Sequence, residues 1–325
     1  MSIKPYFYLS ITYTSLLSLV SERTDSETYS AKFMIGKSEL IINGDGSVFH
    51  LHMRSEALAD TVLLVGDPER SDWIARYFDR IESSSANREF RSHTGTIGGV
   101  RLTVVSTGIG CDNIDIVMNE LDALANVDFA TRTVKPPAQR RSLRIVRLGT
   151  CGALREEIRL GDLVMSAVSG GIDGLLNFYA GGDAVCDRAI EEAFVRQTGW
   201  GERWARPYFV HNDPSLIELF GDVAIAGLTL SAPGFYAPQG RVVRLPLACA
   251  DYLERIGRFE YEGLRAANFE MESSAIAGLG ALAGHRTLTV CTVIAQRVAS
   301  DSRPDYAGFV RRLVETALAK LTGGE

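Results

Sequence analysis

The sequence predicts an α/β fold in which a central sheet is covered by helices on both faces. Short apolar runs rich in β-branched residues alternate along the chain with longer helical stretches. These runs are almost continuously apolar, which is typical of strands that are buried on both faces. Their alternation with helices indicates an α/β layer architecture. No linker or internal repeat interrupts the pattern, so residues 34–325 are predicted to form a single domain.

The alternation divides the chain into expected strands and expected helices. The strands are predicted at residues 61–66, 101–108, 143–150, 162–168, 223–232 and 287–295. The helices are predicted at residues 71–78, 112–125, 187–196, 248–261, 272–283 and 306–321. The basic segment 131–143 contains two consecutive prolines and is predicted to be a surface loop.

Residues 1–33 differ from the rest of the chain, because hydroxyl and aromatic side chains dominate them. The apolar run from Tyr6 to Val20 is interrupted by hydroxyls and is too short to span a bilayer. The features of a signal peptide are weak in this stretch. We therefore expect residues 1–33 to be a disordered extension, or a start assigned too early with Met34 as the natural one. In both cases the segment would lie outside the catalytic fold.

Charge and cysteine content exclude several classes of protein. The net charge is −6 and there is no long basic run, which argues against a nucleic-acid partner. The five cysteines are scattered without a C-x-x-C spacing. This usage suits reduced thiols in a cytoplasmic protein, and neither a disulfide framework nor a zinc site is expected. We expect no metal and no membrane association.

Several expected strands end in polar segments that contain glycine. These segments are GDPER at 66–70, STGIG at 106–110, RLGTCG at 147–152 and AQR at 295–297. Ligands of α/β sheets bind beyond the carboxyl ends of the strands, so the segments are expected to converge on one site.

Two of these segments carry groups suited to an anion. In GDPER, Gly66 allows backbone to approach a ligand and Arg70 adds a guanidinium beside helix amides. A plain turn with a solvated arginine is the alternative. In RLGTCG, Arg147 lies within an apolar strand and Thr150 follows at its end. An unpaired guanidinium would be costly there, so we favour oxyanion binding over a structural ion pair.

Two further segments are more ambiguous. STGIGCDN resembles a dinucleotide fingerprint only in part, because Asn113 occupies the third glycine position. An NAD-dependent dehydrogenase therefore stays a rival interpretation. GFYAPQGR places Phe235 before Gln239 and Arg241. An aromatic ring, an amide and a guanidinium together are suited to the edge of a heterocycle. A mere surface loop is the alternative.

The stretch NFEMESSA raises the question of what two acids do at the start of an apolar helix. Glu270 and Glu272 bracket Met271 just before a run of small and apolar residues. A buried carboxylate without a partner loses its hydration, so each acid is expected to meet a ligand or a cation.

Taken in order, the motifs VFHL, GDPER, NREF, STGIG, RLGTCGAL, FYAPQGR, NFEMES and IAQR resemble a known family. The chain resembles the nucleoside phosphorylases that include uridine phosphorylase and the hexameric purine nucleoside phosphorylases. The resemblance runs from about Val48 to the C-terminus. It implies a three-layer α-β-α sandwich around a mixed, mostly parallel sheet.

The resemblance also implies a role for each matching residue. Phosphate would be bound by Gly66, Arg70, Arg147 and Thr150, with Arg88 from a neighbouring subunit. Ribose would be bound by Met271, Glu272 and the neighbour's His50, with Phe49 also crossing. The base would be bound by Phe235, Gln239, Arg241 and Arg297. The catalytic groups among these would be Arg70, Arg147, Thr150, Arg241 and Glu272, with Glu270 as a structural partner of an arginine.

The reaction that the resemblance implies is phosphorolysis, in which a nucleoside and inorganic phosphate give the free base and ribose 1-phosphate. No cofactor or metal is required, and a homo-oligomer built from dimers, a hexamer in the family, is expected. Purine enzymes of the family carry an aspartate after the last core strand, where this chain has Ala295 and Gln296. Uridine is therefore the expected substrate, with thymidine and deoxyuridine left open. The alternatives are a purine phosphorylase or nucleosidase of the same family and a non-catalytic nucleoside-binding protein.

Overall fold

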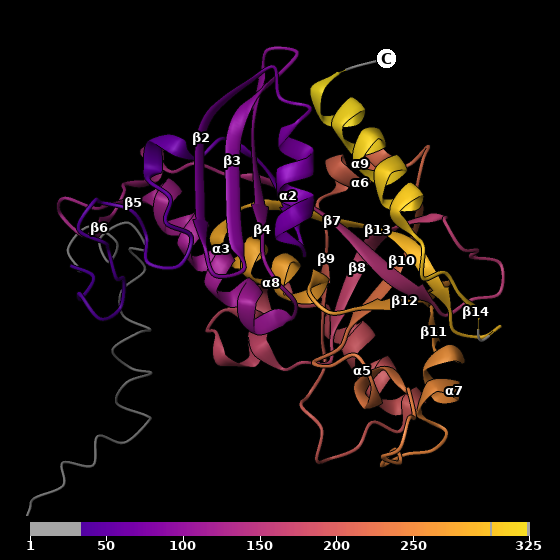
Figure 1. The fold of residues 1–325 in the computed structure, drawn as a ribbon. Coiled ribbons are helices and arrows are strands. Elements are labelled where there is room, and N and C mark those ends of the chain that lie inside the picture. The colour runs from indigo at the N-terminus through magenta and orange to yellow at the C-terminus, as the bar shows by residue number, and fades with distance from the viewer. Residues whose placement is uncertain (1–33, 300, 324–325) are drawn as a thin grey trace, which may run out of the picture.

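The computed structural model describes residues 34–299 and 301–323. The expectation for residues 1–33 lies outside the described residues. Within them, the chain forms a large mixed sheet with helices on both faces, as predicted (Figure 1). The strands follow the order β11-β12-β10-β8-β13-β7-β1-β4-β3-β2, with β9 on β8 and β14 on β13.

The strands at the centre of the sheet are β1 (Thr61–Val65), β4 (Val100–Ser106), β7 (Arg144–Ala153) and β13 (Arg286–Gln296). They pair in parallel, so their carboxyl ends meet at one edge. The strands beyond β13 are β8 (Leu163–Gly171), β10 (Ile225–Ser231), β12 (Leu264–Glu270) and β11 (Glu260–Tyr261). The remaining strands of this sheet are β2 (Arg80–Asn87), β3 (Phe90–Ile97), β9 (Tyr208–His211) and β14 (Asp301–Ser302). A separate ribbon joins β5 (Val127–Asp128) and β6 (Thr133–Val134).

The helices form the two outer layers. One layer contains α3 (Cys111–Asn126) and α8 (Ser273–Ala283). The other contains α2 (Pro68–Ala75), α6 (Pro214–Phe220) and α9 (Ala307–Thr322). The helices α5 (Arg188–Thr198) and α7 (Tyr252–Gly257) pack beyond β9, β11 and β12. The short helices are α4 (Gly182–Val185), η1 (Ser55–Ala57), η2 (Pro137–Gln139), η3 (Leu175–Phe178) and η4 (Ala237–Gln239).

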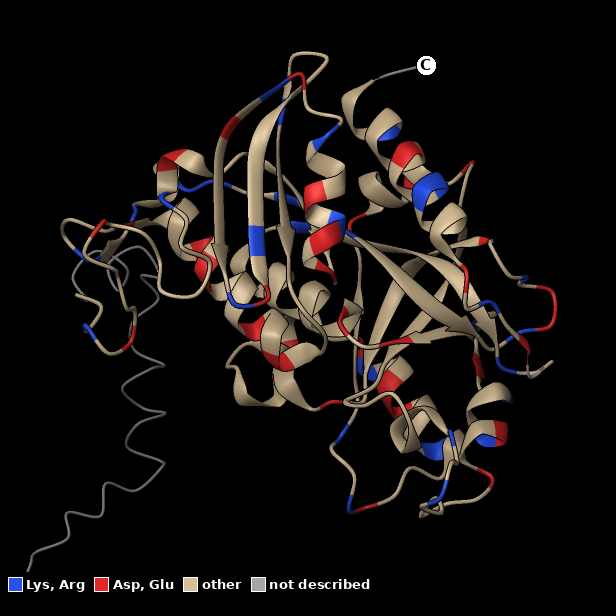
Figure 2. Cartoon of the chain, in the orientation of Figure 1, with Lys and Arg blue, Asp and Glu red and all other residues tan. Residues whose placement is uncertain are grey.

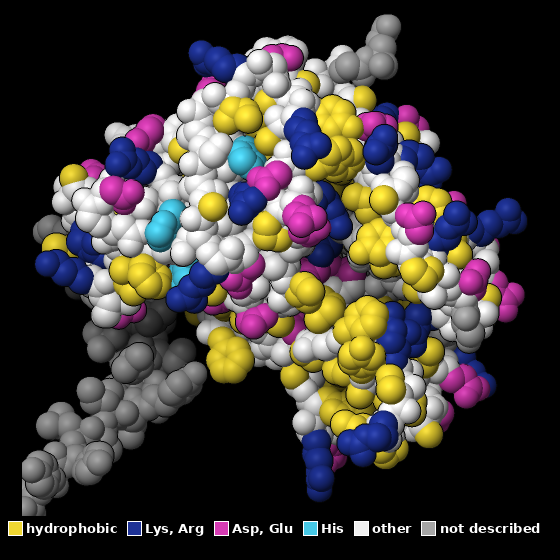
Figure 3. Space-filling view, in the orientation of Figure 1, with side chains coloured by type: hydrophobic (Ala, Val, Ile, Leu, Met, Phe, Trp, Pro, Cys, Tyr) yellow, Lys and Arg dark blue, Asp and Glu magenta, His cyan; other side chains and the backbone are white. Residues whose placement is uncertain are grey.

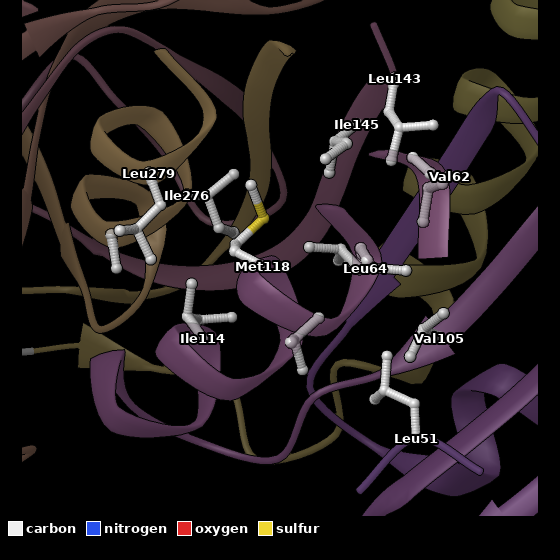
Figure 4. Packing of buried hydrophobic residues seen from close by; sticks show 14 of the residues in the cluster. Leu51, Val62, Leu64, Val105, Ile114, Met118, Leu143, Ile145, Ile276 and Leu279 are labelled. Carbon is white, nitrogen blue, oxygen red and sulfur yellow. The ribbon is translucent and has the colours of Figure 1, made fainter. Parts of the chain in front are cut away.

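Strand β1 shows why the sheet needs both layers. Val62 and Leu64 pack in the cluster with α3 and α8 (Figure 4). Leu63 and Val65 pack on the other face against α2, α6 and α9. All four side chains are 0% exposed. Burial of each contributes about 1.5–3 kcal/mol to the free energy of unfolding. The continuous apolar run therefore holds β1 between the two layers.

The sheet also closes on itself at one end, which the sequence did not predict. Strand β12 pairs in parallel with β10 and antiparallel with β7. The second pairing joins Asn268 to Ala153 and Phe269 to Gly152. Strands β7, β13, β8, β10 and β12 therefore form a closed ring of neighbours, which brings the end of β12 and the start of α8 beside the end of β7.

Local signals explain where several helices begin. Asp67 caps α2 by accepting a hydrogen bond from the amide of Glu69, and Pro68 occupies the first helical turn. Asp187 caps α5 in the same way, and that helix ends at Gly199 in the left-handed conformation.

Several elements were missed or misplaced, among them β9 and α6, which were not predicted at all. The hairpin β2–β3 was missed, because β2 lies at the sheet edge and RIESSSAN carries one large apolar side chain. Strand β12 was missed as well. The helix expected over 248–261 covers only Tyr252–Gly257, and its last residues instead form β11, which pairs with β12.

Charged side chains of both signs are interspersed over the elements, with no continuous basic band (Figure 2). None of the helices within 34–299 and 301–323 combines the length and apolar character needed to cross a bilayer.

Candidate active site

A cavity of about 520 Å³ lies beyond the carboxyl ends of β1, β4, β7 and β13. Each of the four polar strand-end segments contributes to its wall, namely through Gly66, Gly108, Thr150 and Ala295. The start of α8 and the loop before η4 complete it. The predicted convergence of these segments on one site is therefore confirmed.

One end of the cavity carries two guanidinium groups. Arg70 lies in the first turn of α2 and donates through one Nη atom to the carbonyl oxygen of Leu148 over 3.3 Å. Burial, and then the nearby charge of Arg147, lower the pKa of Arg70. Gly66 and Thr150 line the same cavity. Two neighbouring cations with amide and hydroxyl groups beside them favour an anion at this end.

Arg147 is paired with the two glutamates of NFEMES. Its guanidinium forms an ion pair with Glu272 and lies 3.5 Å from a carboxylate oxygen of Glu270. Arg147 is 5% exposed, Glu272 3% and Glu270 4%. Burial alone would lower the pKa of Arg147, but the negative charges of Glu272 and Glu270 hold it above its usual value. The ion pair that we considered the weaker alternative for Arg147 is therefore present, and its guanidinium still lines the cavity.

The segment STGIG holds the Glu272 carboxylate through a backbone hydrogen bond. The amide of Gly110 donates to Glu272 Oε1 over 2.7 Å. Gly108 has a φ of +71°, and a Cβ there would lie 2.4 Å from the side-chain nitrogen of Asn113. Only glycine fits that turn without strain. In this structure the turn holds a carboxylate of the chain itself.

Glu270 has a structural role at the start of α8. Its carboxylate accepts hydrogen bonds from the amides of Glu272 and Ser273 over 2.9 and 3.0 Å, and from Ser231 Oγ over 2.5 Å. These bonds satisfy helix amides that have no partner within the helix.

Burial raises the pKa of Glu272 above its ordinary value of 4.5, and the charge of Arg147 opposes that shift.

The other end of the cavity carries the loop GFYAPQGR. Arg241 donates to Gln239 Oε1 and to the carbonyl oxygen of Phe235, and its guanidinium lies 3.8 Å from the ring centroid of Phe235. Arg297 donates to the carbonyl oxygen of Gln239 over 3.1 Å. Burial, and then repulsion from Arg297, lower the pKa of Arg241 to about 10. The predicted base-side residues therefore form one network.

Four predicted residues do not line this cavity, and one of them, Arg297, lies behind its wall and contacts the backbone of Gln239 there. His50 and Phe49 lie in the loop before η1, where His50 Nδ1 lies 2.7 Å from Glu120 Oε1. Arg88 lies in the tight turn between β2 and β3 with a φ of +53°. The neighbouring side chain of Asn87 donates to the carbonyl oxygen of His50 over 2.9 Å, so these loops lie side by side.

Four residues after β13 line the cavity without having been predicted, and Pro304 is one of them. Strand β14 folds back on β13 and pairs Ser302 with Ala295, so that Ser302, Arg303 and Tyr306 line the cavity. Asp301 pairs with Gln296 and is exposed outside the lining. This segment is polar and lacks periodicity, and nothing in its sequence signals the reversal. In the part of the chain that the structure describes, no cluster of three or more His, Cys, Asp or Glu side chains is arranged to hold a metal ion.

Comparisons with known proteins identify the fold and the family. Residues 60–322 match the model of the phosphorylase superfamily. The uridine phosphorylase of Thermococcus kodakarensis is 29% identical over 262 residues, which cover 79% of this chain and 80% of that protein. A DeoD-type purine nucleoside phosphorylase of Shewanella loihica is 28% identical over 199 residues, 58% of this chain and 78% of that protein.

A solved structure is similar over nearly the same region. The Trypanosoma brucei nucleoside phosphorylase, described as showing uridine phosphorylase activity, superposes with a TM-score of 0.79 at 30% identity. The match covers 87% of this chain and 99% of that one. The chain therefore belongs to the phosphorylase superfamily.

Proposed function

We propose that this protein is a uridine phosphorylase, a pentosyltransferase that converts uridine and phosphate into uracil and ribose 1-phosphate. The observation that carries the proposal is that Arg70, Arg147 and Glu272 line one cavity whose other end holds Gln239 and Arg241. An anion end, a carboxylate and a heterocycle end in that order match the three parts of the reaction. The relatives named uridine phosphorylase support the same substrate.

Phosphate is the nucleophile in the proposed reaction. One of its oxygens attacks C1′ of the ribose, the glycosidic bond breaks, and the bonding electrons leave with uracil. Arg70 and Arg147 bind the phosphate, assisted by Thr150 and the backbone at Gly66. Positioning of a bound nucleophile in this way can lower a barrier by about 7–11 kcal/mol. No cofactor is needed, because the arginines and the co-substrate supply the chemistry.

Glu272 binds the ribose. Its carboxylate accepts hydrogen bonds from the ribose diol, and hydrogen bonds to a charged acceptor are about twice as strong as neutral ones. The same negative charge stabilises the cationic sugar that forms as the glycosidic bond breaks. Met271, which also lines the cavity, packs against the sugar. When phosphate binds Arg147, the ion pair between Arg147 and Glu272 weakens. The Glu272 carboxylate is then free to accept hydrogen bonds from the ribose diol.

Gln239 and Arg241 bind the base, with Arg297 in support and Phe235 against its ring. The uracil anion is stabilised through its carbonyl oxygens by these donors. Position 295 is an alanine whose β-strand partner is Ser302, and Asp301 is exposed beside it. Among the described residues after β13, no acid lines the cavity to protonate a purine nitrogen, which favours uracil in this proposal.

A second copy of the chain completes the site in this proposal. Phe49, His50 and Arg88 lie outside their own chain's cavity, and Phe49 is 36% exposed. We place them at the neighbour's ribose and phosphate within a homo-oligomer built from dimers, a hexamer in its full form. The enzyme acts in the cytoplasm in pyrimidine salvage.

The dimer proposal is tested by hybrid subunits. Arg88→Ala and Glu272→Gln are each expected to inactivate the enzyme. After subunit exchange, a hybrid dimer has one site with both residues intact, so part of the activity should return. Failure to recover activity in a verified hybrid would contradict the shared site.

The purine alternative rests on the DeoD-type relatives, and one assay separates the two substrates. Initial rates with uridine, thymidine and inosine are measured at saturating phosphate. We expect uridine to be cleaved fastest. Inosine cleaved faster than uridine would reject the base assignment. Reduction of NAD without cleavage of any nucleoside would favour a dehydrogenase, and binding of uridine without turnover would favour a nucleoside-binding protein.

A further inference from the structure

A second cavity, of about 300 Å³, lies behind the loop of the base-side residues. Pro233, Ala237 and Pro238 line this second cavity. Phe235 and Gln239 of the same loop line the catalytic cavity instead. The loop is therefore a wall with one face toward each cavity, and the second cavity is separate from the proposed phosphate and ribose contacts.

Three aromatic side chains form much of the second cavity. Trp200, Trp204 and Tyr252 line it, with ring centroids 4.7, 5.5 and 6.1 Å apart. Trp200 Nε1 donates to the carbonyl oxygen of Ala205 over 2.9 Å, and the Tyr252 hydroxyl donates to that of Pro238 over 3.0 Å. Because these polar atoms are already engaged, the rings offer the cavity mainly their apolar surface. On the space-filling surface, apolar side chains gather below the sheet, where α5 and α7 lie (Figure 3).

A carboxylate also lines the second cavity. Asp173 follows β8 and lines the cavity. It accepts hydrogen bonds from the Leu175 amide over 2.7 Å, the Tyr208 hydroxyl over 2.9 Å and the Ser274 hydroxyl over 2.8 Å. All three donors are neutral, and no Lys, Arg or His of the described residues forms an ion pair with Asp173. Burial raises the pKa of Asp173. Within residues 34–299 and 301–323, the negative charge of Asp173 therefore has no ion-pair partner.

We propose that this cavity binds a small organic cation, an ammonium group carried on a flat apolar body. Aromatic faces attract cations through their quadrupoles, most strongly for Trp and when the cation is desolvated. The Asp173 carboxylate supplies the opposite charge and a charge-assisted acceptor. A cavity of this volume is at the small end of ligand sites, which suits a single ring with a short arm. An anionic ligand would be repelled by the Asp173 carboxylate. A neutral ligand would leave the negative charge of Asp173 without a compensating cation.

The test compares three ligands of one shape and different charge. 3-Phenylpropan-1-ammonium, 3-phenylpropan-1-ol and 3-phenylpropionate, which have the same number of carbons beyond the ring, are titrated into the full chain by calorimetry, with saturating phosphate and uracil to fill the catalytic cavity. We expect the ammonium to bind at least about tenfold more tightly than the alcohol, and the carboxylate to bind least. Equal binding of all three, or no binding of the ammonium, would overturn the proposal.

Two substitutions in one loop locate the binding. Ala248 lines the second cavity, whereas Ala250 is exposed outside its lining. Ala248→Trp fills the cavity and should weaken binding of the ammonium by about tenfold or more, whereas Ala250→Trp should leave it unchanged. Both variants are expected to fold and to cleave uridine, since neither residue lies in the catalytic cavity. Unchanged binding in Ala248→Trp would place the cation elsewhere and refute this site.

Discussion

Arg147 and Glu272 form a buried ion pair, although 125 positions separate them in the chain. Strand β7 brings the arginine to the sheet edge, and the pairing of β12 with β7 brings the glutamate to meet it. Burial of both charges is costly even when they are paired, so such a pair is weak evidence for stability. Its position between the two ends of the cavity instead points to a role in coupling phosphate and ribose.

The substitution Glu272→Gln tests the acid of that pair. The amide keeps the shape but loses the negative charge that stabilises the cationic sugar. We expect kcat of the folded protein to fall on the order of 10²–10³-fold, and the thermal unfolding midpoint to fall as well, because Arg147 loses one partner of a buried ion pair. The matched control is Glu192→Gln, an exposed glutamate of α5 that should retain full activity. Wild-type kcat in Glu272→Gln would show that the acid does not act in the reaction.

The pH dependence follows from the environment of the same acid. Burial raises the pKa of Glu272 above its ordinary 4.5, so the carboxylate is present above that raised value and is lost as the pH falls through it. We expect kcat/KM, which reports groups of the free enzyme, to decline on an acid limb whose midpoint lies above pH 4.5. A profile that stays flat down to pH 4.5 would contradict a role for the buried carboxylate.

Tyr306 offers a test at the phosphate end. It lines the cavity with Arg70, and we predict that its hydroxyl donates a hydrogen bond to the bound phosphate. Loss of a hydrogen bond to a charged group costs about 1.5–3 kcal/mol, so Tyr306→Phe should raise the KM for phosphate by about tenfold or more. Tyr77→Phe is the control, because that hydroxyl bonds to Glu315 at an exposed site. A change in the KM for uridine alone would assign Tyr306 to the base instead.

Arg241 tests the base end. Arg241→Leu removes the guanidinium that holds Gln239 and should reduce kcat/KM for uridine by about 100-fold, while the KM for phosphate changes little. Arg244→Leu alters an exposed arginine of the same loop and serves as the control. Equal losses in the two variants would indicate damage to the loop as a whole.

The sequence allowed the layers of the fold and the convergence of strand ends to be predicted. Continuous apolar runs such as TVLLV require cover on both faces, and the carboxyl ends of parallel strands must meet at one edge. The hairpin β2–β3 could not be found in this way, because an exposed edge strand needs no apolar face. The closure of the sheet through β12 depends on pairing between distant segments, which no local pattern records.

Some site residues could likewise be recognised in the sequence, whereas their partners depend on the tertiary fold. Arg147 was recognised because a guanidinium within an apolar strand must have a partner, but the identity of that partner depends on the tertiary fold. STGIG resembles a dinucleotide fingerprint only in part, and in the structure its Gly110 amide donates a hydrogen bond to Glu272. Tyr306 reaches the cavity only because β14 reverses onto β13, and no signal in the polar segment marks that reversal.

The central claim is that phosphate, held by Arg70 and Arg147, is the group that attacks the ribose. Phosphorus NMR of a reaction of wild-type protein with uridine and inorganic phosphate measures this directly. We expect a ribose 1-phosphate signal that grows in step with uracil, and no release of uracil when phosphate is omitted. Uracil released at the same rate without phosphate, with free ribose as the other product, would contradict it.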